Sequence, residues 1–160
     1  RLQKGTIRFN NREISMKLFL DTNVLIDFIL ERQPFYQAAA MIISYAVEDK
    51  IQICASSLSF VTTNFICIER CKMPIEIFKN KINFLREFID ITSVDKTDIY
   101  NSYDSLWKDF EDGVQYYSAK RANVDYIVTR NTKDFEENDI KAISLDETIK
   151  ILKKISEKYQ

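Results

Sequence analysis

The chain has 160 residues, of which 46% are hydrophobic and 12% aromatic, and a formal net charge of −1. This composition is too apolar for a disordered chain, and a charge near zero provides no overall attraction to nucleic acid. The sequence has no histidine and only two glycines, which excludes histidine-dependent triads, glycine-rich phosphate loops and dinucleotide-binding folds. No apolar run approaches the roughly 18 residues of a membrane-spanning helix.

The first residues of the chain differ in character from the rest. Residues 1–15 are polar and basic, and they lack the apolar core of a secretory signal. The regular pattern of apolar residues begins at Met16. We therefore expect residues 1–15 to be a leader that is disordered or foreign to the native protein, and residues 16–160 to form one domain.

Apolar runs and helical periodicity alternate from Lys17 onward. Short apolar runs predict strands at residues 17–20, 51–55, 91–94, 126–129 and 141–145. Helical spacing and capping residues predict helices at residues 23–30, 34–49, 58–71, 74–89, 95–107, 109–123 and 146–155. This alternation predicts an α/β fold in which helices cover both faces of a mainly parallel sheet.

The chain contains three cysteines, Cys54, Cys67 and Cys71. Cys67 and Cys71 would share one face of a helix, but without histidine a structural zinc site would lack a fourth ligand. We interpret the three cysteines as free, buried thiols of a protein in a reducing cytoplasm.

The first acidic candidate for function follows the first expected strand. Asp21 comes directly after Leu20, and open α/β sheets bind ligands at the carboxyl ends of their strands. A helix N-cap is the alternative explanation for an aspartate in this place. Because Asn23 is also of a capping type and one helix needs only one cap, the carboxylate of Asp21 is left for a ligand.

Two further groups of polar residues repeat this pattern: Asp109, Glu111 and Asp112 at the start of an expected helix, and Thr129, Asn131 and Asp134 after an expected strand. Each group also has a structural explanation, as a negatively charged helix start or as an Asx turn. The three groups together, two at strand ends and one at a helix start, favour a divalent-metal site.

These segments resemble the PIN domain, in particular the VapC-type toxin ribonucleases. The resemblance is carried by residues 18–27, 109–112 and 125–135, and it extends from Met16 to about Leu145. It implies a three-layer α/β/α sandwich around a mainly parallel five-stranded sheet. It also implies an endoribonuclease in which bound Mg²⁺ or Mn²⁺ polarises the RNA phosphate and activates water. Such proteins are usually homodimers that an antitoxin protein silences.

The resemblance assigns roles to individual residues. It implies three catalytic carboxylates, on Asp21, Asp112 and Asp134. These three would bind the metal together with Asn131. The residues that would support them are Asn23, Thr129, Asp109 and Thr62.

Two positions depart from the pattern of the family. Its members usually carry a glutamate early in the helix after the second strand, where this chain has Thr62, or Asn64 in a shifted register. They also carry an aspartate where this chain has Asn131. Neutral oxygen ligands lower the charge of a cation site and thereby its affinity. Reduced or lost activity is therefore an open alternative, in which the PIN-like domain serves binding or assembly.

A second alternative uses Asp21 as a phosphorylated nucleophile. A receiver domain would need an acidic pair before this aspartate and a lysine late in the chain, and no such arrangement is evident. A haloacid-type phosphatase would need a second aspartate where Asn23 stands.

An RNA substrate also needs positive charge near the acidic residues. Four basic residues flank the motifs and are our candidates for phosphate contacts: Lys120, Arg121, Arg130 and Lys133. An ordinary solvated surface is the alternative for all four. The partners that we expect are RNA, an antitoxin and a second copy of the chain, without a membrane.

Overall fold

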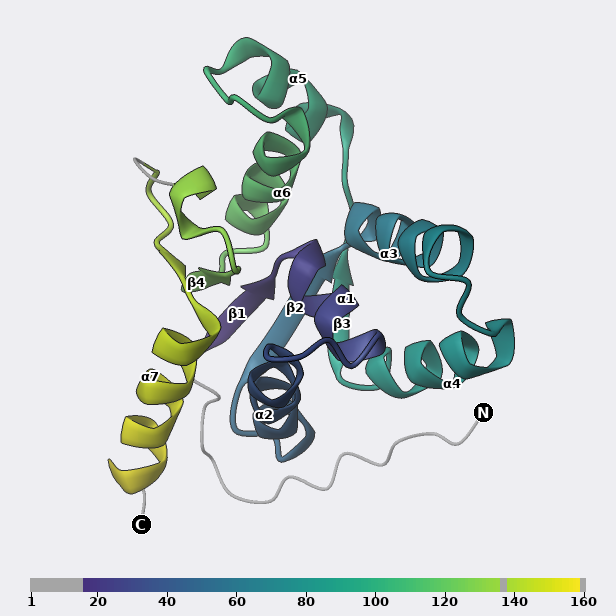
Figure 1. Cartoon of the computed structure of the whole chain (residues 1–160). Helices are drawn as coiled ribbons and strands as arrows, with labels where there is room; N and C mark the ends of the chain where they lie inside the picture. Colours follow the sequence, from purple (N-terminus) through teal and green to yellow (C-terminus); the bar gives the residue numbers. More distant parts are fainter. Residues whose placement is uncertain (1–15, 136–137, 159–160) are drawn as a thin grey trace, which may run out of the picture.

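The computed structural model describes residues 16–135 and 138–158, so the expected leader, residues 1–15, lies outside the described residues. A five-stranded parallel sheet with the order β3-β2-β1-β4-β5 runs through the centre (Figure 1). Its strands are β1 (Lys17–Leu20), β2 (Gln52–Ser56), β3 (Ile89–Thr92), β4 (Tyr126–Val128) and β5 (Ala142–Ile143). The predicted fold class is confirmed, and every strand pair is parallel.

Helices connect the strands and close the fold. The helices are α1 (Thr22–Ile29), α2 (Tyr36–Val47), α3 (Ser57–Asn64), the π-helical η1 (Phe65–Arg70), α4 (Ile75–Leu85), α5 (Lys96–Asp104), α6 (Phe110–Arg121), the 3-10 helix η2 (Thr132–Phe135) and α7 (Leu145–Lys158). None of these helices is both long and apolar enough to cross a membrane.

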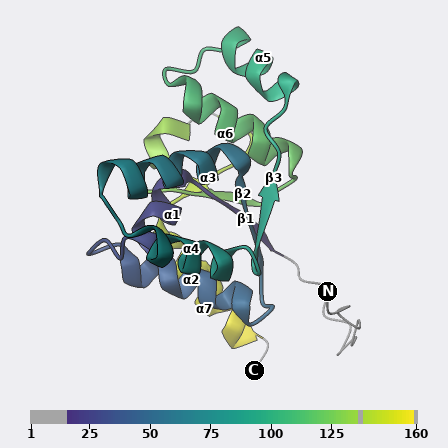
Figure 2. The same ribbon diagram turned by 90° about the vertical axis from the view of Figure 1, so that its right-hand side faces the viewer.

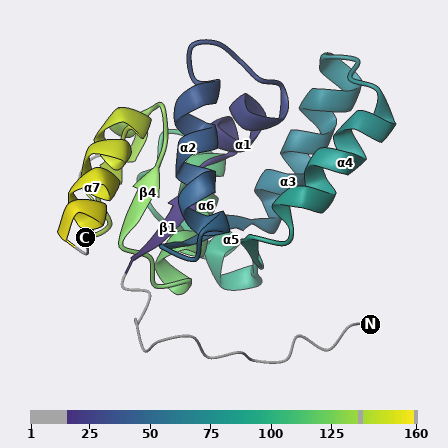
Figure 3. The same ribbon diagram turned by 90° about the horizontal axis from the view of Figure 1, so that it is seen from below.

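Alternate side chains of β1 point to opposite faces of the sheet, and each face has its own core. Leu18 and Leu20 belong to the larger cluster, which includes buried residues of α1, α2, α4 and α7. Phe19 lies on the other face, among buried residues of α6 and η2. Helices α5 and α6 accordingly lie on one side of the sheet, and α2, α4 and α7 on the other (Figure 2). Seen from below, α2 lies between α7 and the α3–α4 pair (Figure 3).

Several expected boundaries differ from the structure by two to four residues, and one expected helix changes type along its length. Strand β3 begins at Ile89 instead of residue 91, because Ile89 is buried (4% exposed) and pairs with Ile53, whereas Ile91 is 53% exposed. The helix expected at 74–89 therefore ends earlier, with Arg86 as its C-cap. The helix expected at 58–71 changes from α-helix to π-helix at Phe65.

The cysteines are free, as predicted, but they are not all buried. Burial raises the pKa of Cys54 and of Cys67 to about 11. Cys71 is exposed because it lies just after the last residue of η1. The expectation of a buried thiol is therefore wrong for Cys71.

The order of the strands places a topological switch point at the centre of the sheet. The chain moves from β1 through β2 to β3 on one side, and then places β4 and β5 on the other side of β1. Strand order therefore reverses between β1 and β4, and open α/β sheets bind ligands where it reverses. Leu20 pairs with Val128, so Asp21 and Thr129 leave the two strands side by side.

Candidate active site

Asp21 lies at the end of β1 with only 7% of its surface exposed, and each of its carboxylate oxygens has a partner. Oδ1 accepts a hydrogen bond from the backbone N–H of Thr22 at 2.7 Å. Oδ2 accepts hydrogen bonds from Thr129 Oγ1 at 2.7 Å and from Asn23 Nδ2 at 3.0 Å. These bonds fix the orientation of the carboxylate.

Asp21 is itself the N-cap of α1, with extended backbone angles. The expectation that Asn23 could take over the cap is wrong, because α1 begins at Thr22, one residue earlier than predicted, and Asn23 is its second residue. Asn23 instead bridges the two strand ends. Its Nδ2 donates to Asp21 and also to Thr129 Oγ1, and its Oδ1 accepts from the backbone N–H of Arg130.

Burial is the main reason why the pKa of Asp21 lies above its ordinary value. The hydrogen bonds from Thr129 and Thr22 lower this pKa, while the negative charge of Asp134 raises it and Arg130 lowers it. A buried carboxylate next to another acidic residue is stabilised in its ionised form by a cation. Asp21 is therefore well placed to face one.

Asp112 enters the site from the first turn of α6. Asp109 caps this helix, since its Oδ1 accepts from the backbone N–H groups of Glu111 and Asp112 at 2.8 and 3.2 Å. The side chain of Asp112 is therefore not needed for the cap. Burial, followed by the charges of Asp109, Asp21, Asp134 and Glu111, raises the pKa of Asp112 to about 7. Carboxylates from three separate segments thus act on one another here.

The segment after β4 contributes the remaining predicted residues. Thr129 is fully buried, and its Oγ1 accepts from the backbone N–H of Asn131 at 3.0 Å. The carbonyl of Asn131 accepts from the backbone N–H of Asp134 at 3.0 Å, which starts the turn of η2. Asp134 is exposed to solvent, and its negative charge raises the pKa of both Asp21 and Asp112.

Thr62 lies on α3 at the edge of this site. Its Oγ1 is 3.5 Å from Glu111 Oε1, in a long hydrogen bond that joins α3 to α6. Burial and the charges of Asp109 and Asp21 raise the pKa of Glu111. The sequence predicts no separate role for Glu111, although this residue lies inside the acidic run at residues 109–112. The carboxylate missing from α3 is thus matched by one from α6.

A buried polar network beneath the acidic residues was not predicted. Gln115 Nε2 donates to Thr22 Oγ1 at 2.8 Å and to Ser59 Oγ at 2.6 Å, and Gln115 Oε1 accepts from Ser56 Oγ. The hydroxyls of Thr22 and Ser59 share a further hydrogen bond of 2.8 Å. The network joins α1, α3 and α6 at the residues next to Asp21 and one turn after Asp112. The sequence offered Ser56, Ser57 and Ser59 only as N-cap candidates for α3, and Ser56 does cap this helix.

Three of the four basic candidates for RNA binding form ion pairs with acidic residues of the same chain. Lys120 pairs with Asp139 at 2.7 Å, and Arg130 Nε lies 2.8 Å from Asp27 Oδ2. Lys133 is exposed, and it makes no ion pair within the described residues. Their roles in RNA binding stay predictions.

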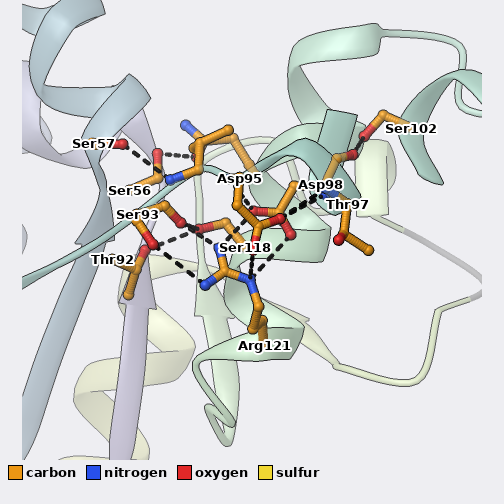
Figure 4. A network of polar contacts seen from close by, with 12 residues as sticks. Ser56, Ser57, Thr92, Ser93, Asp95, Thr97, Asp98, Ser102, Ser118 and Arg121 are labelled. Carbon is orange, nitrogen blue, oxygen red and sulfur yellow. Dashed lines mark hydrogen bonds and ion pairs between the residues drawn. The ribbon is translucent and has the colours of Figure 1, made fainter. Parts of the chain in front are cut away.

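Arg121 is the most strongly held of the four. Its guanidinium donates to Asp98 Oδ2 at 2.6 Å and to the carbonyl of Ser93, and it lies 3.4 Å from Asp95 Oδ2 (Figure 4). Asp98 is almost fully buried. The contacts join the end of α6 to the start of α5, so Arg121 has a clear structural use.

The donor set of the site suits a hard divalent cation. It consists of carboxylate, amide and hydroxyl oxygens, which Mg²⁺ and Mn²⁺ prefer. In the part of the chain that the structure describes, no three acidic or thiol side chains are placed to hold one ion by themselves. Mg²⁺ is commonly held by one or two carboxylates and keeps several water ligands. The residues therefore fit a cation whose remaining ligands are water and substrate.

The fold and the site define a class of protein, a parallel α/β domain with clustered carboxylates at its topological switch point. The family model described as "PIN domain" matches residues 17–133. The chain therefore belongs to the PIN domain family, and the predicted resemblance is confirmed.

Individual relatives agree with this family. Over 137 residues the chain is 28% identical to "Ribonuclease VapC1" of Aquifex aeolicus (strain VF5). This alignment covers 83% of this chain and 93% of the relative. Two solved structures share the fold. The VapBC2 structure from Rickettsia felis, bound to a promoter DNA fragment, aligns with a TM-score of 0.59 at 14% identity, over 81% of this chain and 98% of the other. A toxin–antitoxin complex from Klebsiella pneumoniae aligns with a TM-score of 0.55 at 20% identity, over 76% and 92%.

Proposed function

We propose that the protein is a metal-dependent endoribonuclease of the VapC type, and the toxin of a toxin–antitoxin pair. One observation carries this proposal. The buried carboxylate of Asp21 is held by Thr129 at 2.7 Å where strand order reverses, and its charge acts on Asp112 of a separate helix. The family, and the name of the relative from Aquifex aeolicus, support a ribonuclease.

The side chains of Asp21, Asp112 and Asp134, together with the oxygen of Asn131, would hold Mg²⁺ or Mn²⁺. A bound cation polarises the phosphate and lowers the pKa of a water molecule. The protein itself supplies orientation. Thr129 and Asn23 fix Oδ2 of Asp21, and Asp109 fixes the start of the helix that carries Asp112. Asp112 accepts no side-chain hydrogen bond in the described residues and is therefore free to orient a water molecule.

Two neutral residues lower the charge of this site. Asn131 and Thr62 stand where the family resemblance implies acidic residues. Neutral residues at these two positions would weaken cation binding. Glu111 returns one negative charge close to Thr62. We therefore propose an enzyme that is active, with a weaker metal affinity than a site with two additional acids would have.

The proposed function also implies the partners of the protein. RNA is the proposed substrate. Lys133 is the basic candidate for its phosphates that makes no ion pair within residues 16–135 and 138–158. The similar structures are of VapBC2 and of a toxin–antitoxin complex, which supports an antitoxin as partner. A homodimer is our expectation from the family alone. Three free cysteines agree with a reducing compartment such as the cytoplasm.

The proposal is tested by cleavage of a labelled single-stranded RNA in Mn²⁺, in Mg²⁺ and in EDTA. We expect cleavage with either metal, none in EDTA, and a loss of about 100-fold or more for Asp21→Asn and Asp112→Asn. Asp146→Asn, an exposed acid in the first turn of α7, is the matched control and should cleave normally.

The alternative is a PIN-like domain that has lost catalysis and serves binding or assembly. Asn131 and Thr62 are the residues that favour it. Folded protein, freed of any antitoxin, that cleaves no RNA in either metal would support this alternative and refute the proposed activity.

A further inference from the structure

Asp27 is a fully buried acidic residue that the proposed chemistry does not use. It lies on α1, and its exposed fraction is 0%. Neither carboxylate oxygen has a hydrogen bond of normal geometry among the described residues. Its close partner is Arg130, whose Nε lies 2.8 Å from Oδ2. Burial raises the pKa of Asp27, whereas the charges of Arg130 and Arg32 lower it. A buried carboxylate is costly unless it is paired, so this pairing calls for an explanation.

Arg130 is held from three sides. Its guanidinium lies 2.8 Å from Asp27 and 4.4 Å from the centre of the Phe35 ring, a cation–π contact. Its backbone N–H donates to Asn23 Oδ1 at 3.3 Å. Only 29% of its side chain is exposed. These contacts come from α1 and from the segment between α1 and α2, so Arg130 joins the strand end after β4 to the helix after β1.

The two neighbours of Arg130 in the chain are part of the acidic site. Thr129 donates to Asp21 Oδ2 at 2.7 Å and accepts from the backbone N–H of Asn131 at 3.0 Å. Fixing Arg130 therefore fixes the hydroxyl that orients Asp21 and the turn that leads to Asp134. Arg130 also lowers the pKa of Asp21 by its positive charge.

We propose that Arg130 is a positioning residue, which uses its ion pair with buried Asp27 to hold Thr129, Asn131 and Asp134 against Asp21. This inference rests on the proposed nuclease function, and it assigns to Arg130 a different task from the phosphate contact expected from sequence. A phosphate contact would require the guanidinium to be free, whereas it is shared between Asp27 and Phe35.

A double-mutant cycle separates the two tasks. The variants are Asp27→Asn, Arg130→Gln and the double variant, studied at a temperature where circular dichroism shows each to be folded. Four quantities are measured: kcat, KM and its dependence on salt for a single-stranded RNA, and the Kd for Mn²⁺ by electron paramagnetic resonance. Arg130→Lys is a milder variant, which keeps the charge but loses the planar guanidinium that contacts Asp27 and Phe35.

We expect each single variant to lower kcat about tenfold and to weaken Mn²⁺ binding several-fold. KM and its salt dependence should stay as in the wild type. The double variant should be no worse than the worse single variant, because both remove the same ion pair.

Two control variants show what a phosphate contact and an uninvolved residue would give. Lys133→Gln, on the same segment, should show the opposite signature of a phosphate contact, with a higher KM and a salt slope smaller by about one. Lys153→Gln, on the exposed face of α7, should change none of the four quantities.

Either of two results would overturn the inference. A higher KM and a reduced salt slope for Arg130→Gln, with additive effects in the double variant, would make Arg130 a phosphate contact. A lower melting temperature with unchanged kcat and Mn²⁺ affinity would make the pair a structural brace only. If the wild type cleaves no RNA, the proposed function fails, and the Mn²⁺ affinities still decide whether Arg130 positions the acidic residues.

Discussion

At the scale of single residues, Asp21 shows that one carboxylate can both cap a helix and be a proposed metal ligand. One oxygen accepts from the first backbone N–H of α1, and the other accepts from Thr129 and Asn23. The sequence suggested a choice between the two roles, because it shows the residue type but not the separate partners of the two oxygens. The structural role of Asp21 and its proposed chemical role therefore rely on the same fixed geometry.

The hydroxyl of Thr129 gives the first prediction. Thr129→Val keeps the shape of the side chain but removes a hydrogen bond that lowers the pKa of Asp21. We expect Mn²⁺ affinity to fall about tenfold, and stability to fall by about 1–2 kcal/mol. Isothermal titration and urea unfolding measure the two effects. Thr148→Val, another buried threonine far along the chain, is the control. Equal Mn²⁺ affinities for Thr129→Val and the wild type would contradict the role given to Thr129.

The raised pKa of Asp112 predicts that the stability of the metal-free protein depends on pH. This pKa rises from 3.8 to about 7 in the folded, metal-free protein. The folded state therefore binds this proton more tightly than the unfolded state does, so the free energy of unfolding should fall as the pH rises from about 4 to about 7.

The substitution Asp112→Asn removes this titrating carboxyl, and with it the fall in the free energy of unfolding as the pH rises. In EDTA, we expect the stability of the variant relative to the wild type to increase by about 1–3 kcal/mol as the pH rises from about 4 to about 7, measured by urea unfolding. Mn²⁺ affinity of the wild type should rise over the same range, because the metal must displace the proton. A stability difference that does not change with pH would refute the raised pKa.

At the scale of elements, α6 does more than close the sheet. It carries Asp112 into the site, brings Glu111 to α3, and buries Gln115 between α1 and α3. These contacts join residues 49 to 93 positions apart in the chain. Local patterns predicted that the helix exists and that it starts with acids, but not which side chains it meets.

Glu111 and Thr62 provide a test of this contact. We expect Glu111→Gln to weaken Mn²⁺ binding several-fold, and Thr62→Glu in the same protein to restore it, because the two positions face one site. Glu76→Gln, an exposed acid on α4, serves as the control. The contact would be without consequence for the metal if the single and double variants both bound Mn²⁺ like the wild type.

The buried network gives a prediction about stability. Gln115→Leu leaves the hydroxyls of Thr22, Ser56 and Ser59 without their amide partner. We expect a loss of about 2–4 kcal/mol in urea unfolding, since buried polar groups without partners are costly. Gln52→Leu, at an exposed position of β2, should change stability by less than about 0.5 kcal/mol. Similar effects of the two substitutions would show that the network does not stabilise the fold.

At the scale of the whole molecule, the sequence predicted the architecture well. Short apolar runs such as Leu18–Leu20 marked buried parallel strands, and the polar residues after two of the strands pointed to the edge where ligands bind. Strand β3 was misplaced because it lies at the edge of the sheet and exposes Ile91, so its apolar pattern does not report its pairing.

The partners of the charged residues could not be predicted in the same way. Arg121 meets Asp98, and Arg130 meets Asp27 103 positions earlier in the chain. Such pairs depend on how helices pack, which periodicity does not specify. The fold thus follows from local pattern, whereas the charge balance of the site follows from tertiary contacts.

The most direct test of a metal-dependent nuclease is to follow RNA cleavage and Mn²⁺ binding together. The cleavage rate and the bound Mn²⁺, seen by electron paramagnetic resonance, are measured over the same range of free Mn²⁺. We predict that both saturate together in the wild type, and that both are lost in Asp21→Asn and in Asp112→Asn. Cleavage that persists in EDTA, or Mn²⁺ binding that survives in both variants, would contradict a catalytic cation held by these carboxylates.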